Sequence, residues 1–338
     1  MTTSFLKNLK KVAEGISQEC KAIPALLTQE DRSTYFVAAS ELFTGQGIIV
    51  DAGAFLGGTA YTLAEGLEKN KKLDGLDKKD LVLSLDMFEV VDETWQRRYP
   101  TMIGLGTGDC FQHLFTQNVS KYSNTVSSKK VDLTEYTYTD PRPIEILGLD
   151  VLKSSDLAIS CFASFLPHLI PGVSFVLHQD HVHATLPFTI SAFHLFSDIL
   201  EPCGECVHTA VFKCVRSITR EDVLERFDGA PDWDRGSKMI VAIEHAIENS
   251  QTDKTRLFYR IALANCYRRV GAHFEAEKLF LNTLIDERAI LADLSSDDIN
   301  QVKYYIDAFL GKFPQGVSQR KKRSPKQRAA EEMSNLSV

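Results

Sequence analysis

The 338-residue sequence lacks any apolar run long enough to cross a membrane as a helix. Its first residues, 1–11, are polar and amphipathic and lack the apolar core of a secretory signal. Hydrophobic residues make up 44% of the chain and charged residues 25%, which are the proportions of an ordinary water-soluble globular protein. The sequence therefore predicts a protein without a membrane span, and we expect a cytoplasmic location.

Regularly spaced pairs of cysteines are also missing. Seven cysteines at irregular positions favour reduced thiols over a disulfide framework. One C-x-x-C pair, Cys203 and Cys206, could form half of a zinc site, with Cys214 further along the chain. Without a second pair we favour the simpler interpretation, a turn between late strands that carries buried thiols.

The chain has no excess of positive charge. Its formal net charge of −7 argues against a nucleic-acid-binding surface over the whole protein. The exception is the run 319–328, which is basic and contains no acidic residue. Such a run can serve as a nuclear import signal, a nucleic-acid contact or a membrane-surface contact. We favour a solvated, disordered tail over these alternatives, because short basic runs are common.

One glycine-rich turn stands out against these absences. Residues 47–60 have the pattern of a buried strand, a tight turn and the start of a helix. Gly53, Gly57 and Gly58 would allow the backbone to approach a ligand where a β-carbon would clash. The helix that follows would direct its free N–H groups back at that ligand.

Two further predicted strands end in acidic residues. The run 81–85 leads into Asp86, and the run 144–149 leads into Asp150. The carboxyl ends of parallel strands line the crevice in which open α/β sheets bind their ligands. We therefore expect both carboxylates to face a ligand-binding crevice together with the glycine-rich turn.

The turn departs from the dinucleotide-binding fingerprint, because Phe55 replaces the glycine that lets the backbone approach a pyrophosphate. Its pattern D-x-G-x-x-x-G-G-T instead resembles motif I of the class I S-adenosylmethionine (SAM) dependent methyltransferases. The resemblance extends over about residues 48–215 and implies a Rossmann-like sheet. It also implies that the turn binds the methionine part of SAM through Asp51, Gly53, Phe55, Gly57, Gly58 and Thr59.

The same resemblance assigns the two other parts of SAM. Asp86 stands where the family has the acid that binds the ribose, and a carboxylate can accept hydrogen bonds from two vicinal hydroxyls. Asp132, near the end of an expected strand at 131–133, would lie close to the adenine.

The stretch from Asp150 to His183 is similar to the region after strand four in macrocin-type sugar O-methyltransferases and in catechol-type and caffeoyl-CoA-type O-methyltransferases. These groups hold a divalent cation with an aspartate after strand four and an acidic or amide pair after strand five. The resemblance implies that Asp150, Asp180 and His181 hold a cation such as Mg²⁺ or Mn²⁺. The catechol-type enzymes also place a lysine base three residues after the first aspartate, which makes Lys153 the base beside Asp150.

This assignment is chemically coherent. A cation between carboxylates would lower the pKa of a substrate hydroxyl, and a lysine with a depressed pKa could accept its proton. Two departures leave an alternative open. Leu152 replaces a second aspartate of the macrocin type, and His181 favours a softer metal than Mg²⁺. In the alternative, Asp180 and His181 end the strand and orient the substrate without a metal.

The expected organisation has four parts: N-terminal cap helices (1–46), a SAM-binding domain (47–217), a helical region (218–314) and a basic tail (315–338). In the helical region, Leu257 to Glu287 resembles a single tetratricopeptide hairpin. One repeat cannot form a solenoid. We therefore favour a hairpin that packs on the catalytic domain or on a second subunit, and the helical region is compatible with a homodimer.

The sequence thus predicts a SAM-dependent methyltransferase that modifies an oxygen of a small-molecule or sugar acceptor. The first rival is a non-catalytic assembly module, which predicts weak or absent SAM binding. The second is a nicotinamide-dependent oxidoreductase, against which Phe55 and the pair of acidic strand ends count.

Overall fold

The computed structural model describes residues 9–91, 94–206, 208–250, 252–294 and 296–310. The chain divides into two compact units, residues 1–287 and residues 288–338. The four-part organisation expected from the sequence stays a prediction, and its basic tail lies outside the described residues. Within the described ranges, every helix is too short or too polar to cross a membrane.

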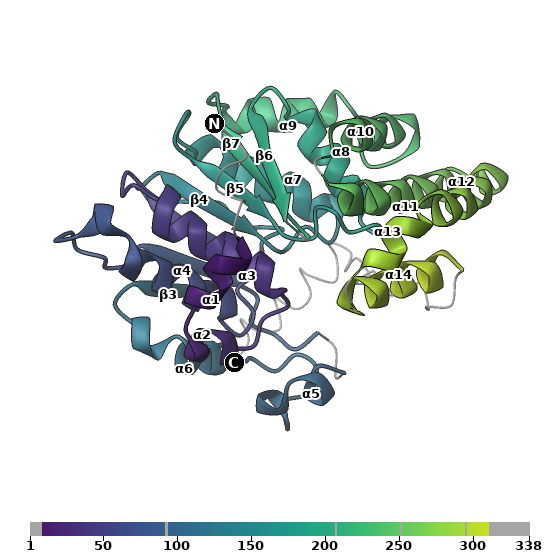
Figure 1. Cartoon of the computed structure of the whole chain (residues 1–338). Helices are drawn as coiled ribbons and strands as arrows, with labels where there is room; N and C mark the ends of the chain where they lie inside the picture. The colour runs from purple at the N-terminus through teal and green to yellow at the C-terminus, as the bar shows by residue number, and fades with distance from the viewer. Residues whose placement is uncertain (1–8, 92–93, 207, 251, 295, 311–338) are drawn as a thin grey trace, which may run out of the picture. The chain divides into compact units, whose positions relative to one another are not determined.

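The first unit is built on a mixed sheet (Figure 1). Its strands in chain order are β1 (Ile48–Ala52), β2 (Val82–Asp86), β3 (Val126–Lys130), β4 (Ile144–Leu149), β5 (Phe175–His178), β6 (Leu200–Cys206) and β7 (Thr209–Cys214). They lie in the order β3-β2-β1-β4-β5-β7-β6, with β1 to β5 parallel and β7 antiparallel to β5. This is the predicted Rossmann-like α/β sheet, to which β7 adds an antiparallel strand.

One strand was not predicted. Cys203 and Cys206 lie in β6, at the edge of the sheet, rather than in a turn. Pro202 and Gly204 suggest a turn, but an edge strand accommodates both, and the pairing with β7 shifts register between them. All the cysteines are free, and no group of three potential metal ligands occurs among the residues that the structure describes.

The helices are α1 (Leu9–Gly15), α2 (Gln18–Ala22), α3 (Gln29–Val37), η1 (Ala38–Leu42), α4 (Gly58–Lys69), η2 (Lys71–Leu73), α5 (Thr94–Arg98), η3 (Pro100–Met102), α6 (Gln112–Asn118), η4 (Ser120–Tyr122), α7 (Ser155–Phe165), η5 (Leu166–His168), α8 (Pro187–Leu195), α9 (Arg220–Asp228), α10 (Gly236–Asn249), α11 (Asp253–Arg269), α12 (His273–Asp286), α13 (Arg288–Asp293) and α14 (Ser296–Phe309). Figure 1 shows α3 and α4 on one face of the sheet and α7, α8 and α9 on the other. Helix α11 packs against both α10 and α12, and α10 and α11 also contact α8.

Helix α3 is fixed to the distant end of the sheet by one carboxylate. Thr28 and Asp31 form a capping box at its N-terminus, which is a standard way to satisfy free helical N–H groups. The other oxygen of Asp31 accepts hydrogen bonds from the backbone N–H groups of His208 and Thr209, both at 3.1 Å, and from the Thr209 hydroxyl at 2.7 Å. The side chain of Asp31 is fully buried. The N-terminal helices are thereby joined to the β6–β7 hairpin.

Helix α11 contacts the same hairpin through a second buried carboxyl group. Glu205 of β6 accepts a hydrogen bond from the hydroxyl of Tyr259, whose ring is buried. Burial raises the pKa of Glu205 to about 7, although the bond from Tyr259 opposes the shift. The protein therefore holds this carboxyl group mostly protonated below neutral pH.

This raised pKa predicts a pH-dependent loss of stability. Below the pKa of the unfolded chain, near 4.5, Glu205 is protonated in both states and costs nothing. Between pH 4.5 and 7 the carboxyl group is ionised in the unfolded chain but protonated in the native state, so the native state loses stability as the pH rises over this range. We expect Glu205→Gln to stabilise the protein by about 2 kcal/mol at pH 8 and to leave stability unchanged near pH 4. Denaturant unfolding at both pH values measures this, with the exposed Glu201→Gln as control; equal effects of the two variants at pH 8 would refute it.

Candidate active site

The glycine-rich segment forms the predicted strand, turn and helix. Strand β1 ends at Ala52 and α4 begins at Gly58. Between them Gly53, Phe55 and Gly57 adopt positive φ angles of 97°, 45° and 92°. Glycine accepts this left-handed conformation without strain, whereas Phe55 is an uncommon exception.

The space beside each glycine is filled by the chain itself. A β-carbon on Gly53 would lie 2.7 Å from the carbonyl oxygen of Asp150, and one on Gly58 would lie 2.5 Å from the β-carbon of Ala25. A β-carbon on Gly57 would lie 2.8 Å from Val119. The close approach that these glycines allow is therefore an approach of protein to protein, and contact of their N–H groups with a ligand stays a prediction.

The side chain of Asp86, at the end of β2, is hydrogen-bonded to the turn that follows β1. One oxygen of its carboxylate accepts a hydrogen bond from the backbone N–H of Phe55 at 2.9 Å, and the other accepts from Phe88 at 2.7 Å. Burial raises the pKa of Asp86, and these backbone bonds oppose the shift. The strand-end position predicted for Asp86 is confirmed, and the carboxylate also holds the turn in shape.

The side chain of Phe55 has a structural role that the sequence did not indicate. Its ring makes edge contacts with Trp95, Tyr99 and Phe111, at centroid distances of 5.1, 5.0 and 5.8 Å. These residues come from the segment between β2 and β3, which also contains the short helix α6. An aromatic cluster thus fixes this stretch against the turn.

Asp51 and Thr59 flank the turn and are buried, at 2% and 8% exposure. The hydroxyl of Ser84 donates a hydrogen bond of 3.1 Å to Asp51. Burial raises the pKa of Asp51 to about 7, and the negative charges of Asp150 and Asp86 add to the shift. The carboxylates expected around the crevice are therefore close enough to influence one another.

Asp132 follows the end of β3 beside Asp86, because the N–H of Val131 donates a hydrogen bond of 2.8 Å to the backbone oxygen of Asp86. The strand expected to end at 131–133 ends earlier, because β3 stops at Lys130. Asp132 follows in a turn, where its side chain accepts hydrogen bonds from the backbone and the hydroxyl of Thr134. Aspartate commonly forms such a turn with the residue two positions ahead. A contact of Asp132 with adenine stays a prediction.

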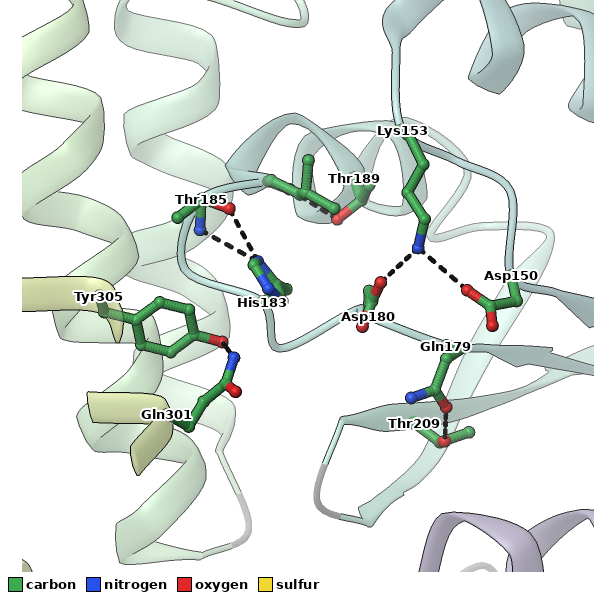
Figure 2. A network of polar contacts seen from close by, with 11 residues as sticks. Asp150, Lys153, Gln179, Asp180, His183, Thr185, Thr189, Thr209, Gln301 and Tyr305 are labelled. Atoms are coloured by element: carbon green, nitrogen blue, oxygen red, sulfur yellow. Dashed lines mark hydrogen bonds and ion pairs between the residues drawn. The ribbon is translucent and has the colours of Figure 1, made fainter. Parts of the chain in front are cut away.

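Lys153 lies between the two predicted metal-binding aspartates (Figure 2). Its Nζ is 2.9 Å from Oδ1 of Asp150, just after β4, and it also forms an ion pair with Oδ2 of Asp180, just after β5. Asp180 has a positive φ of 64°, a conformation that aspartate tolerates better than most residues. The three side chains are 40%, 22% and 24% exposed, so the cluster is open to solvent on one side.

A lysine that acts as a base was expected to have a lowered pKa, whereas the pKa of Lys153 is raised. Burial lowers the pKa of Lys153, but the two carboxylates outweigh it and hold that pKa above its usual value. Burial raises the pKa of Asp150 to about 6 against the attraction of Lys153. For Asp180, Lys153 and His183 outweigh burial and hold the pKa below its usual value. Lys153 is thus an ammonium group here.

His181 does not join the carboxylates. Its ring packs against Phe193 and Phe212, and its Nδ1 lies 3.1 Å from Nδ1 of His178. Burial lowers the pKa of His181 to about 3, so the imidazole is neutral. Apolar packing on the α8 face of the sheet determines its direction, and the structure does not place it as a third ligand beside Asp150 and Asp180.

Tyr35 is a site residue that the sequence reasoning missed. It lies on α3, is 1% exposed, and packs over β4 so closely that a β-carbon on Gly148 would be 3.1 Å from its ring. Burial and the negative charges of Asp150 and Asp51 raise its pKa, so its hydroxyl stays protonated near these carboxylates. Gly148, inside a buried strand, was a signal of such close packing, but it did not identify the partner.

No protein-family model and no curated protein matches the sequence. Among solved structures, a TDP-rhamnose 3'-O-methyltransferase of calicheamicin biosynthesis, CalS11, is 14% identical, with a TM-score of 0.40 over 62% of this chain and 92% of that one. An rRNA methylase from Streptococcus thermophilus is 13% identical (TM-score 0.36; 57% and 100%). An O-methyltransferase family protein from Burkholderia thailandensis is 11% identical (TM-score 0.34; 63% and 68%). These likenesses concern the fold alone.

Proposed function

We propose that this protein is a SAM-dependent methyltransferase that methylates a hydroxyl oxygen of a small molecule or sugar. The observation that carries the proposal is the position of Asp86. Its carboxylate ends β2 and bonds to the turn after β1, at the edge of the sheet where strand order reverses between β1 and β4. Open α/β sheets bind ligands at this switch point.

The residues at the turn fit SAM, which supplies an electrophilic methyl group on a sulfonium ion. Each oxygen of Asp86 already accepts one backbone N–H, but a carboxylate has about four acceptor sites. The remaining acceptor sites of Asp86 can therefore accept hydrogen bonds from the two ribose hydroxyls. Asp51 and Thr59 lie beside the turn and are the further candidates for contact with the methionine part.

The cluster of Asp150, Lys153 and Asp180 is suited to hold the acceptor hydroxyl, because it lies at the carboxyl ends of β4 and β5 and is partly exposed. In the transfer, the acceptor oxygen forms a bond to the methyl carbon while the bond from that carbon to sulfur breaks, which leaves a neutral thioether. The hydroxyl proton passes to Asp150, since an ammonium group has no lone pair to receive it. The protein mainly contributes proximity and orientation.

Calorimetric titration with SAM tests the proposal. We expect wild-type protein to bind SAM with micromolar affinity and Asp86→Ala to bind at least about 100-fold more weakly, because hydrogen bonds to a charged group contribute about 1.5–3 kcal/mol each. The control is Asp74→Ala, which removes an exposed carboxylate. Wild-type protein that does not bind SAM would overturn the proposal, and binding of NADH instead would support the oxidoreductase.

A further inference from the structure

We infer that Lys153 takes the place of a divalent cation, so that the acceptor site works with an ammonium group from the chain itself. The inference goes beyond the identity of the methyl donor and concerns the position between Asp150 and Asp180. In the O-methyltransferases that this region resembles, that position belongs to a metal ion. Its consequence for catalysis rests on the proposed function, whereas the cation test below does not.

The geometry of Lys153 is the first argument. Its Nζ contacts one carboxylate oxygen from each aspartate, at 2.9 Å for Asp150. These aspartates follow β4 and β5, which are neighbouring parallel strands with Leu149 opposite His178. Two carboxylates brought together at adjacent strand ends repel each other unless a positive charge lies between them. Lys153 supplies that charge, as Figure 2 shows.

The remaining donors do not fit a metal ion. Ca²⁺ takes six to eight oxygen ligands, and Mg²⁺, which one or two carboxylates and several waters can hold, would need these two carboxylates free of the ammonium group. The third predicted ligand, His181, has its ring among Phe193 and Phe212. Throughout the described part of the chain, no three His, Cys, Asp or Glu side chains come together as a metal site. A divalent cation would also have to displace the ammonium group from both carboxylates.

The ammonium group can perform the electrostatic part of the cation's task. It has three N–H donors, two of which are directed at Asp150 and Asp180. The side chain is 40% exposed, which leaves the third donor able to reach a bound hydroxyl oxygen. A donor at that place stabilises the negative charge that develops on the acceptor oxygen during methyl transfer. Lys153 is then a positioning and charge-stabilising group and not the base.

Binding of Mn²⁺ to the full chain, followed by the electron paramagnetic resonance signal of the free ion, tests the inference. We expect wild-type protein to bind Mn²⁺ no more tightly than about 1 mM, the weak end of the range for cation sites with oxygen ligands. Lys153→Met removes the charge with little change in length and leaves two unpaired carboxylates. This variant should bind one Mn²⁺ at least tenfold more tightly than wild type, and addition of Asp180→Asn should abolish the gain.

The matched control is Lys278→Met, which makes the same change at an exposed position of α12 and should not alter Mn²⁺ binding. Lys153→Arg retains the charge and should also bind Mn²⁺ no better than wild type. Stoichiometric, micromolar Mn²⁺ binding to wild-type protein that disappears in Asp150→Asn would overturn the inference. The wild-type titration decides this even if a Lys153 variant fails to fold. A failure of SAM binding would count against the proposed function and not against this result.

Discussion

Replacing Asp31 by alanine is expected to lower the free energy of unfolding by about 4 kcal/mol. The substitution removes the acceptor for three hydrogen bonds from His208 and Thr209, and it also removes half of the capping box with Thr28. The Thr209 hydroxyl can still donate to Gln179, but the backbone N–H groups of His208 and Thr209 lose this acceptor, and each buried donor left without a partner costs about 1–3 kcal/mol. Urea unfolding followed by circular dichroism measures the loss.

Asp222→Ala is the matched control for this experiment. Asp222 holds the same position in a capping box with Thr219 at the start of α9, but its side chain is exposed. Its loss should cost about 1 kcal/mol, the usual contribution of a helix cap. The difference between the two variants isolates the bonds from α3 to the hairpin, and equal losses would show that these bonds contribute nothing.

Gly53→Ala should be the second most damaging change, with an expected loss of about 3 kcal/mol. The residue has a φ of 97°, which an L-amino acid with a side chain adopts at a cost of about 1–2 kcal/mol. In addition, the new methyl group would lie 2.7 Å from the backbone oxygen of Asp150 and 2.8 Å from Val151, and overpacking costs about 1–3 kcal/mol. The backbone oxygen cannot move aside as a flexible side chain could.

Gly75→Ala separates these two contributions. Gly75 has a similar φ of 80°, but a β-carbon there would meet no atom within 4 Å. The free energy of unfolding of Gly75→Ala should therefore fall only by the cost of the backbone conformation, about 1 kcal/mol. Thermal unfolding of both variants measures the contrast. Similar melting temperatures for Gly53→Ala and Gly75→Ala would mean that the structure relaxes around the new methyl group.

The features that depend on local pattern were predictable from the sequence. The apolar run before Asp150 forms β4, as expected. The strand, turn and helix from Ile48 onward follow from glycine positions and buried apolar residues. Strand ends in a parallel sheet share one edge, which accounts for the proximity of Asp150 and Asp180 that the resemblance implied.

The features that depend on packing were not predictable in the same way. The spacing of Asp150 and Lys153 suggested a base, but the charge of Lys153 follows from its contact with a second carboxylate 27 residues further along the chain. His181 has a neighbour suited to metal binding in Asp180, yet its ring is drawn into apolar packing with Phe193 and Phe212. Sequence spacing does not determine which of these contacts prevails.

The bonds from Asp31 to the hairpin also constrain the order in which the chain can fold during synthesis. Asp31 and Thr209 are 178 residues apart. Helix α3 therefore leaves the ribosome long before the residues whose N–H groups donate hydrogen bonds to Asp31. Until β7 has emerged, a nascent chain would have to bury that carboxylate alone or leave it in water, and water is favoured. The first helices should therefore complete their docking late in synthesis, which favours slow folding dominated by distant contacts.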